Sequence, residues 1–317
     1  MNELVTQAER WSIVIPLYRE AVHLAATLQQ IVGVVESLGR DYEIILVDDG
    51  SPDDTWSVIQ QQCAANPSLR GLRLSRNFGK ESALAAGLEQ ARGNPVLLMD
   101  GDLQHPPTLI PQMYGAWQQG AEVVEAVKVH RDHETVWDRF KARSFYRVFS
   151  MLAGYDLRGA SDFKLMDQRV LQAWLKLGER NLFFRGMHAW LCFRRVQLPF
   201  DVPERAGGHT SWSLWSLLRL AVTALTSFSS APLQLISLAG AGFGMVALVL
   251  GVQTLYLKLS GTAIPGFTTV ILLLLLIGSV MMIGLGIIGS YIARIYDEVK
   301  GRPRYIVAEQ ARCPPPR

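Results

Sequence analysis

The sequence predicts an α/β domain built on a mostly parallel sheet with helices on both faces, followed by two helices that cross a membrane. Short apolar runs alternate four times with stretches of helical periodicity, and polar residues and glycine follow the apolar runs. Near the C-terminus, the stretches 220–257 and 259–293 each lack any charged residue. Soluble domains seldom sustain such stretches, and a membrane-spanning helix needs about 20 apolar residues.

Five runs are expected to form strands: residues 12–16, 43–47, 69–74, 95–99 and 121–129. Residues 12–16 and 43–47 have the short apolar pattern of buried strands, whereas residues 69–74 alternate. Helical periodicity predicts helices over residues 21–38, 55–65, 80–91 and 107–119. Asp53 or Asp54 is suited to cap the helix at 55–65.

Polar residues cluster where the predicted strands end, and ligands of such sheets bind beyond the carboxyl ends of the strands. We therefore expect one crevice lined by Tyr18, Glu20, Asp48, Asp49, Arg76, Asn77, Gly79, Lys80, Asp100 and Asp102. The sequence has no glycine-rich fingerprint of the Rossmann or P-loop kind, which argues against those two phosphate sites.

The triplet Asp100-Gly101-Asp102 directly follows the fourth predicted strand. In an extended segment, residues i and i+2 point to the same side, so the two carboxylates can hold one divalent cation. Gln104 can add a neutral oxygen, and Mg²⁺ fills its remaining positions with phosphate oxygens and water. The alternative is a turn in which the aspartates only cap the next helix.

Another acidic loop, VDDGSPDDT, follows the second predicted strand. Asp48 and Asp49 are interpreted as acceptors of hydrogen bonds from the base or ribose of a nucleotide. Asp53 and Asp54 are interpreted as structural, in a turn that leads into the helix at 55–65.

The bulk composition excludes some classes of protein. The formal net charge is only +3, from 31 basic and 28 acidic residues, so no nucleic-acid partner is expected. The three cysteines are widely spaced and odd in number, which favours a reduced, cytosolic setting for the domain. The first ten residues are polar and do not resemble a secretory signal.

The two uncharged stretches are interpreted as transmembrane helices over residues 232–257 and 267–293, with two buried core helices as the alternative. Basic residues precede the first helix and follow the second, whereas the connection holds only Lys258, so both chain ends are expected in the cytoplasm. Residues 213–228 are expected to lie along the membrane surface or to continue the first span. The expected organisation is a catalytic domain over 1–212, an interfacial helix over 213–231, a hairpin over 232–293 and a cytoplasmic tail over 294–317.

Several motifs resemble those of known enzyme families. PLYRE at 16–20, VDDGSPDDT, RNFGK at 76–80 and DGDLQHPP at 100–107 resemble inverting family-2 glycosyltransferases of the GT-A fold. GASDFKLMD at 159–167, ERNLFFRG at 179–186 and YIARIYDEVKGRPRYIV at 291–307 resemble the polyprenyl-phosphate glycosyltransferases. This group includes dolichyl-phosphate mannose synthases and bacterial bactoprenol glucosyltransferases, and the resemblance covers nearly the whole chain.

The resemblance implies that a sugar moves from a UDP- or GDP-sugar to the phosphate of a membrane polyprenol, with inversion. It places the nucleoside at Pro16, Tyr18, Glu20 and Asp48, and the metal, Mg²⁺ or Mn²⁺, at Asp100, Asp102 and Gln104. Asp49 and Lys80 are expected beside them in the donor site.

The resemblance also places Asp162 in the active site, where it positions the sugar or the acceptor, and Arg205 against the donor diphosphate. Relatives often carry a lysine in the loop after Arg205, but this chain reads Gly208-His209-Thr210-Ser211-Trp212 and lacks it. His105 and His209 are interpreted as bystanders, with a histidine that completes a Mn²⁺ site as the alternative for His105.

The acceptor phosphate has a second pKa near 6 and is largely ionised at neutral pH, so it can attack without a catalytic base. Residues 132–147 carry Arg139 and Arg143 among aromatic residues, and Lys128 ends the fifth predicted strand. These three are expected to hold the acceptor phosphate at the membrane. A helix with a solvated basic face is the alternative for 132–147.

Two other functions fit parts of the sequence. A processive polysaccharide synthase shares the fold, but the Gln-x-x-Arg-Trp motif of such enzymes is absent here. A membrane-anchored, inactive scaffold is the second, and the intact Asp100 and Asp102 argue against it. The sugar is not fixed by the sequence; UDP-glucose and undecaprenyl phosphate at the bacterial inner membrane are the expected substrates, and the resemblance is compatible with a homo-tetramer.

Overall fold

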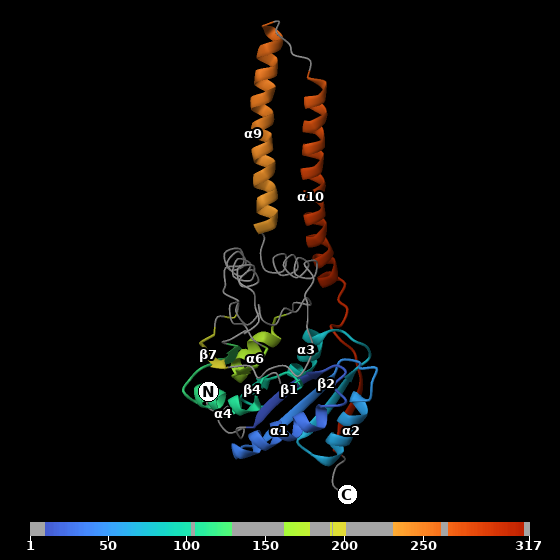
Figure 1. Cartoon of the computed structure of the whole chain (residues 1–317), viewed down its shortest axis with the longest axis vertical. Helices are drawn as coiled ribbons and strands as arrows, with labels where there is room; N and C mark the ends of the chain where they lie inside the picture. The colour runs from blue at the N-terminus through green and yellow to red at the C-terminus, as the bar shows by residue number, and fades with distance from the viewer. Residues whose placement is uncertain are drawn as a thin grey trace. The chain divides into compact units, whose positions relative to one another are not determined.

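The computed structural model describes residues 10–102, 105–128, 162–177, 191, 193–200, 231–260 and 266–313 (Figure 1). The chain divides into two compact units. The larger contains Met1–Tyr146, Tyr155–Thr210 and Pro303–Arg317, and the smaller contains Arg147–Gly154 and Ser211–Arg302. The C-terminal segment therefore belongs to the same unit as the N-terminal domain.

The larger unit is built on one sheet, whose strands in the described residues lie in the order β7-β5-β6-β4-β1-β2-β3-β8. The bounds are β1 Trp11–Leu17, β2 Tyr42–Asp48, β3 Leu69–Leu74, β4 Val96–Leu98, β5 Val123–Lys128, β6 Lys164–Met166, β7 Arg195–Phe200 and β8 Val307–Arg312. β4, β1, β2 and β3 run parallel, as do β5 and β7. β6 is antiparallel to β4 and β5, and β8 is antiparallel to β3.

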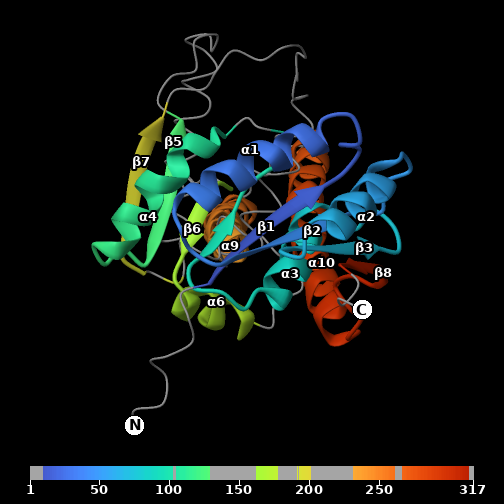
Figure 2. The ribbon, with the colours of Figure 1, turned by 90° about the horizontal axis from the view of Figure 1, so that it is seen from below.

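Helices cover both faces of this sheet (Figure 2). α1 (Leu24–Ser37), α2 (Thr55–Ala65) and α4 (Ile110–Gln118) lie on one face, and α3 (Lys80–Gln90) and α6 (Gln168–Leu175) lie on the other. The first face holds the main core, in which Trp11, Ile13 and Leu46 are fully buried. On the second face, a Cβ added at Gly87 would lie 2.3 Å from Val14 Cγ1, so α3 packs directly on β1.

The predicted α/β class is confirmed, and most predicted elements lie within a few residues of the observed ones. α2 and β3 have the predicted bounds, and the predicted helix 107–119 begins as a short 3-10 turn, η1 (Pro107–Leu109). The sheet is mostly parallel, as predicted, and it is mixed because β6, between β4 and β5, and β8, beside β3, run in the opposite direction. No pattern in the residues around 164–166 indicates that this strand runs antiparallel to its neighbours.

The C-terminal segment that was expected to be a tail contains strand β8. Trp56 Nε1 donates a hydrogen bond to Glu309 Oε2 (2.9 Å), and the Tyr305 hydroxyl donates to Glu89 Oε2 (2.6 Å). Arg304 donates to the carbonyl oxygen of Leu177 (2.9 Å). The chain after the last helix is thus fastened to α2, α3 and the end of α6.

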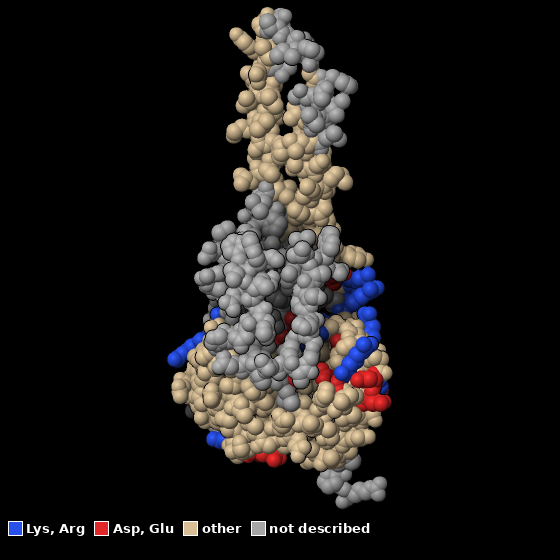
Figure 3. Space-filling view, viewed as in Figure 1, with Lys and Arg blue, Asp and Glu red and all other residues tan. Residues whose placement is uncertain are grey.

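The smaller unit contains two long helices, α9 (Ala231–Leu259) and α10 (Phe267–Val299), at the predicted positions. Their apolar side chains are largely exposed, with Leu238 at 70% and Met282 at 69%, so they are not buried core helices. Figure 3 shows surface free of charged residues along most of their described length. Within the described residues, Leu276–Val299 is long and apolar enough to cross a membrane, and α9 has a shorter apolar segment, Leu238–Gln253.

Candidate active site

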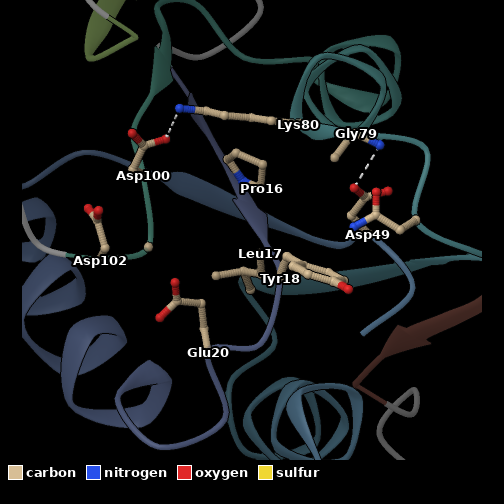
Figure 4. A pocket seen from close by; sticks show the side chains of 12 residues that line it. Pro16, Leu17, Tyr18, Glu20, Asp49, Gly79, Lys80, Asp100 and Asp102 are labelled. Carbon is tan, nitrogen blue, oxygen red and sulfur yellow. Dashed lines mark hydrogen bonds and ion pairs between the residues drawn. The ribbon is translucent and has the colours of Figure 1, made fainter. Parts of the chain in front are cut away.

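A cavity of about 310 Å³ lies beyond the carboxyl ends of the parallel strands β1, β2 and β4 (Figure 4). This is the edge at which the sequence predicted a crevice, because parallel strands all end on the same side. The lining residues come from these strand ends and from the start of α3. They are Pro16, Leu17, Tyr18, Glu20, Asp49, Asn77, Gly79, Lys80, Ala83, Asp100, Gly101 and Asp102.

The Asp100-Gly101-Asp102 triplet forms one wall of the cavity. A Cβ added at Gly101 would lie 2.5 Å from Leu17 Cδ2, so the small residue lets the loop rest on the end of β1. Asp100 and Asp102 both line the cavity, and neither caps a helix in the described structure. The geometry favours the cation-holding interpretation of this triplet over the alternative of a helix cap.

Lys80, the first residue of α3, lies between two carboxylates. Its Nζ is 2.6 Å from Asp100 Oδ1 and 2.7 Å from Asp162 Oδ2. Burial opposes the charged form of Lys80, but the two carboxylates outweigh it, and the pKa of the ammonium group is raised above its usual value. Lys80 therefore brings Asp162, which precedes β6, to the same site as Asp100.

Glu20 and Asp102 point into the same part of the cavity (Figure 4). Burial, followed by the negative charges of Asp102 and Asp100, raises the pKa of Glu20 above its usual value. This part of the cavity is consequently rich in negative charge, and it favours a ligand that carries positive charge or hydroxyl donors.

The acidic loop that follows β2 holds the Glu20 segment in place. The backbone N–H of Arg19 donates to Ser51 Oγ (3.0 Å), and that of Glu20 donates to Thr55 Oγ1 (3.0 Å). Arg19 has a φ of 60°, which is uncommon for a residue other than glycine. These side-chain contacts fix the strained turn that presents Tyr18 and Glu20 to the cavity.

Asp49 lines the cavity, while its neighbour Asp48 does not. Asp49 accepts hydrogen bonds from the backbone N–H groups of Phe78 (2.8 Å) and Gly79 (2.9 Å). Asp48 is fully buried; it accepts a hydrogen bond from the Ser51 N–H (3.0 Å), and its Oδ2 lies 3.5 Å from Arg73 Nε. Burial raises the pKa of both carboxyl groups.

Of the two later acidic residues in this loop, Asp53 has the predicted structural role. Asp53 Oδ1 accepts hydrogen bonds from the hydroxyl (2.7 Å) and the N–H (3.3 Å) of Thr55. Asp54 occupies the N-cap position of α2 without a side-chain cap. The turn therefore orients Thr55, whose hydroxyl in turn holds Glu20.

The family resemblance implies a divalent cation, and the donor set fits one. Asp100 and Asp102 offer hard carboxylate oxygens in one cavity, and Mg²⁺ in proteins needs only one or two such ligands beside phosphate and water. No group of three or more histidine, cysteine or acidic ligands occurs in the described part of the chain. His105 Nδ1 lies 4.0 Å from Asp100 Oδ2, but its ring is buried beside Phe163 and Phe200 and does not line the cavity.

Four expected site residues lie outside the described residues: Gln104, Arg139, Arg143 and Arg205. Lys128 is the last residue of β5. The sequence reasoning missed Ser51 and Thr55 as supports of the Glu20 turn, and it missed Arg73 beside Asp48. Arg73 had a signal, because it is an arginine within a strand that ends at the predicted crevice.

Comparison with known proteins identifies the family of the chain. Residues 12–174 match the sequence profile of "Glycosyl transferase family 2". The uncharacterized glycosyltransferase YkcC of Bacillus subtilis is 37% identical over 94% of this chain and 93% of that protein. The prophage bactoprenol glucosyl transferase homolog of Escherichia coli is 33% identical, over 93% of this chain and 97% of its own length. The bactoprenol glucosyl transferase of Shigella phage SfII is 33% identical, over 96% and 99%.

Solved structures with a similar chain trace are more distant. Glucosyl-3-phosphoglycerate synthase from Mycobacterium tuberculosis, in complex with Mn²⁺, UDP and its product, has a TM-score of 0.46 and 19% identity, over 69% of this chain and 80% of that chain. TarS 1–349 of Staphylococcus aureus in complex with UDP-GlcNAc has a TM-score of 0.42 and 18% identity, over 70% and 67%.

Proposed function

Since this chain belongs to glycosyl transferase family 2 and is a glycosyltransferase, we propose that it transfers glucose from UDP-glucose to undecaprenyl phosphate. The transfer inverts the configuration of the anomeric carbon and takes place at the cytoplasmic face of a bacterial membrane. The acceptor is inferred from relatives named bactoprenol glucosyl transferases that align over nearly the whole chain.

The observation that carries the proposal is the cavity that joins Asp100 and Asp102 to Tyr18, Glu20 and Asp49. Asp100 and Asp102, the proposed metal ligands, lie on one side of the cavity, and Tyr18 and Asp49 lie on the other (Figure 4). A nucleotide diphosphate needs this combination, because its phosphates require positive charge while its base and ribose require an apolar surface and hydrogen-bond acceptors.

The chain's own residues have distinct roles in the proposed donor complex. Tyr18, whose side chain is 40% exposed, offers an aromatic surface to the base, and Glu20 accepts hydrogen bonds from ribose hydroxyls. Asp100 and Asp102, with Gln104, would hold Mg²⁺ or Mn²⁺, which supplies positive charge for the leaving UDP. Asp162, held by Lys80, borders the place of the sugar.

The chemistry then needs positioning more than proton transfer. An oxygen of the ionised lipid phosphate attacks the anomeric carbon from the face opposite to UDP, and the carbon–oxygen bond to UDP breaks. No proton is removed in this step, because the phosphate is already ionised at neutral pH. The protein therefore holds the donor and acceptor in line, and Lys128, Arg139 and Arg143 are proposed to hold the acceptor phosphate.

A lipid acceptor in the membrane explains why the chain carries the apolar helices of the smaller unit. We infer that α9 and α10 both cross the membrane, which leaves both chain ends in the cytoplasm. α10 contains an apolar segment of 24 residues, Leu276–Val299, and exposed apolar side chains continue along α9.

The proposal is tested with full-length protein in detergent, radiolabelled UDP- and GDP-sugars and undecaprenyl phosphate, with and without Mg²⁺. The expected product is a labelled glycolipid from UDP-glucose alone, and it disappears with EDTA or in Asp102→Ala. Asp54→Ala is the matched control, because Asp54 is exposed and outside the cavity. A glycolipid that forms undiminished in Asp102→Ala would exclude the metal assignment, and a product without lipid would exclude the acceptor.

A further inference from the structure

Lys80 is the basic residue among the described residues that line the cavity, where it faces four acidic ones: Glu20, Asp49, Asp100 and Asp102. Its ammonium group bridges Asp100 and Asp162 at 2.6 and 2.7 Å, distances of strong charge-assisted hydrogen bonds. The side chain extends from the first turn of α3 to Asp100 (Figure 4). In this state Lys80 neutralises part of the negative charge of the cavity.

The position of Lys80 conflicts with a second cation at the same carboxylate. Mg²⁺ would approach a carboxylate oxygen to about 2.1 Å. The ammonium nitrogen lies 2.6 Å from Asp100 Oδ1, so both cations at this carboxylate would face each other at short range. Like charges at such a distance repel strongly in a partly buried site.

Lys80 is able to move away. The lysine side chain has four rotatable carbon–carbon bonds and a compact head with three donors, so the ammonium can exchange partners without backbone movement. It is also 42% exposed, which leaves room beside it in the cavity. A move that releases Asp100 while it keeps Asp162 brings the ammonium toward the centre of the cavity.

We propose that Lys80 is a stand-in cation that occupies Asp100 in the free enzyme, is displaced by the divalent cation and then contacts the donor diphosphate. The inference rests on the proposed function, since it concerns the same donor site. Under this proposal, Lys80 competes with the bare metal ion for Asp100, but it binds the diphosphate once the metal–nucleotide complex is in the cavity.

This exchange predicts effects of opposite sign when the charge of Lys80 is removed. In Lys80→Met, Asp100 has no competing cation, so bare Mn²⁺ binds about 5-fold more tightly or better, the usual lower range of coupling between two ligands. The diphosphate loses one positive contact, so UDP binds the Mn²⁺-saturated protein about 5-fold more weakly or worse. A purely structural lysine would weaken both affinities or neither.

The experiment uses the full chain in detergent. Free Mn²⁺ is followed by electron paramagnetic resonance during titration, and UDP binding at saturating Mn²⁺ is measured by calorimetry. Lys80→Arg keeps the charge and is expected to bind bare Mn²⁺ with nearly wild-type affinity, which separates charge from shape. Lys176→Met is the matched control, because Lys176 is exposed at the end of α6 and outside the cavity.

Weaker or unchanged Mn²⁺ binding by Lys80→Met would overturn the competition, and unchanged UDP binding would overturn the diphosphate contact. A thermal unfolding midpoint equal to that of the wild type checks that each variant is folded. The outcome is separable from that of the proposed function. If the binding effects appear but no glycolipid forms, the acceptor is wrong; if glycolipid forms without these effects, the role of Lys80 is wrong.

Discussion

The two acidic loops of this protein look alike in sequence and differ in structure. Each follows a buried parallel strand, and each carries aspartates next to a glycine at the same edge of the sheet. In the first loop, Asp48 and Asp49 are almost fully buried, at 0% and 3%, and hydrogen-bonded to the chain around them. In the second loop, Asp100 is paired with the ammonium group of Lys80 and Asp102 is exposed in the cavity.

The difference shows how one residue type serves two purposes. A buried carboxylate whose lone pairs accept backbone N–H groups organises the loops around it, because leaving those groups without partners would be costly. An exposed carboxylate in the cavity wall can instead contact a ligand. The first loop is therefore expected to determine stability, and the second is expected to determine activity.

The sharpest test of this contrast is Asp102→Asn. The variant keeps the size of the side chain but removes charge from the metal-binding wall, so kcat is expected to fall by about 10²–10³-fold. Because Asp102 is exposed, its free energy of unfolding should change by less than about 0.5 kcal/mol. Initial rates of glycolipid formation and thermal unfolding of the same preparations check both halves. If Asp102→Asn were destabilised but active, the second loop would determine stability rather than activity, which would contradict the contrast between the loops.

The next largest effect is expected from Gly50→Ala in the first loop. Gly50 has a φ of 65°, and an added Cβ would lie 2.4 Å from the carbonyl carbon of Arg76. The left-handed conformation costs about 1–2 kcal/mol, and the clash with a rigid backbone adds about 1–3 kcal/mol.

Gly39→Ala is the matched control for this prediction. Gly39 has nearly the same φ, 64°, but nothing lies within 4 Å of an added Cβ. It should therefore lose only the backbone contribution, and Gly50→Ala should unfold at a clearly lower temperature. Equal midpoints for the two variants would mean that the contact between the acidic loop and the RNFGK segment carries no stability.

Asp49→Asn tests the buried carboxylate itself. The side-chain amide can accept only at its oxygen, so one of the N–H groups of Phe78 and Gly79 loses its acceptor. The expected loss is about 1.5–3 kcal/mol of stability, the range for hydrogen bonds to charged groups. Thermal unfolding is compared with that of Asp102→Asn, and an equal shift in both variants would contradict the contrast between the loops.

The sequence predicted the cavity well because its signal is local. Pro16 ends a predicted strand, Tyr18, Glu20, Asp100 and Asp102 follow one, and parallel strands end at one edge. The division of labour between Asp48 and Asp49 was not visible, since neighbours in a strand point to opposite faces and either could have faced the ligand.

Long-range pairing was also beyond the sequence. Lys80 and Asp162 are 82 residues apart, and Glu309 reaches Trp56 across 253 residues. The segment around Val307 follows a long apolar helix and reads as a polar tail, because an edge strand with one exposed face has no apolar run to reveal it. The antiparallel insertion of β6 was missed for a different reason, because its three residues carry too short a pattern.

The smallest effect is expected where the C-terminal strand supports the first loop. Arg73 lies between Asp48 and Glu309, at 3.5 Å from the former and 2.8 Å from the latter. The hydrogen bonds from Arg73 and then Trp56 lower the pKa of Glu309 below its usual value of 4.5. At a pH between the folded and the unfolded pKa of Glu309, the folded state binds fewer protons than the unfolded state. The carboxylate of Glu309 therefore adds stability as pH rises.

Glu309→Gln should therefore lower the thermal unfolding midpoint slightly at pH 7, and its deficit should vanish as pH falls through the folded pKa of Glu309, below 4.5. Asp54→Asn, an exposed acidic residue without a cap contact, should show no such pH-dependent difference from the wild type. The measurement is a series of thermal scans of the three proteins from pH 7 to pH 3.5. A deficit that persists unchanged at the acidic end would mean that Glu309 acts through packing of β8 rather than through its charge. In that case the contact between Arg73 and Asp48 would not depend on the charge of Glu309, and the first loop would be less firmly tied to the C-terminal strand than its hydrogen bonds indicate.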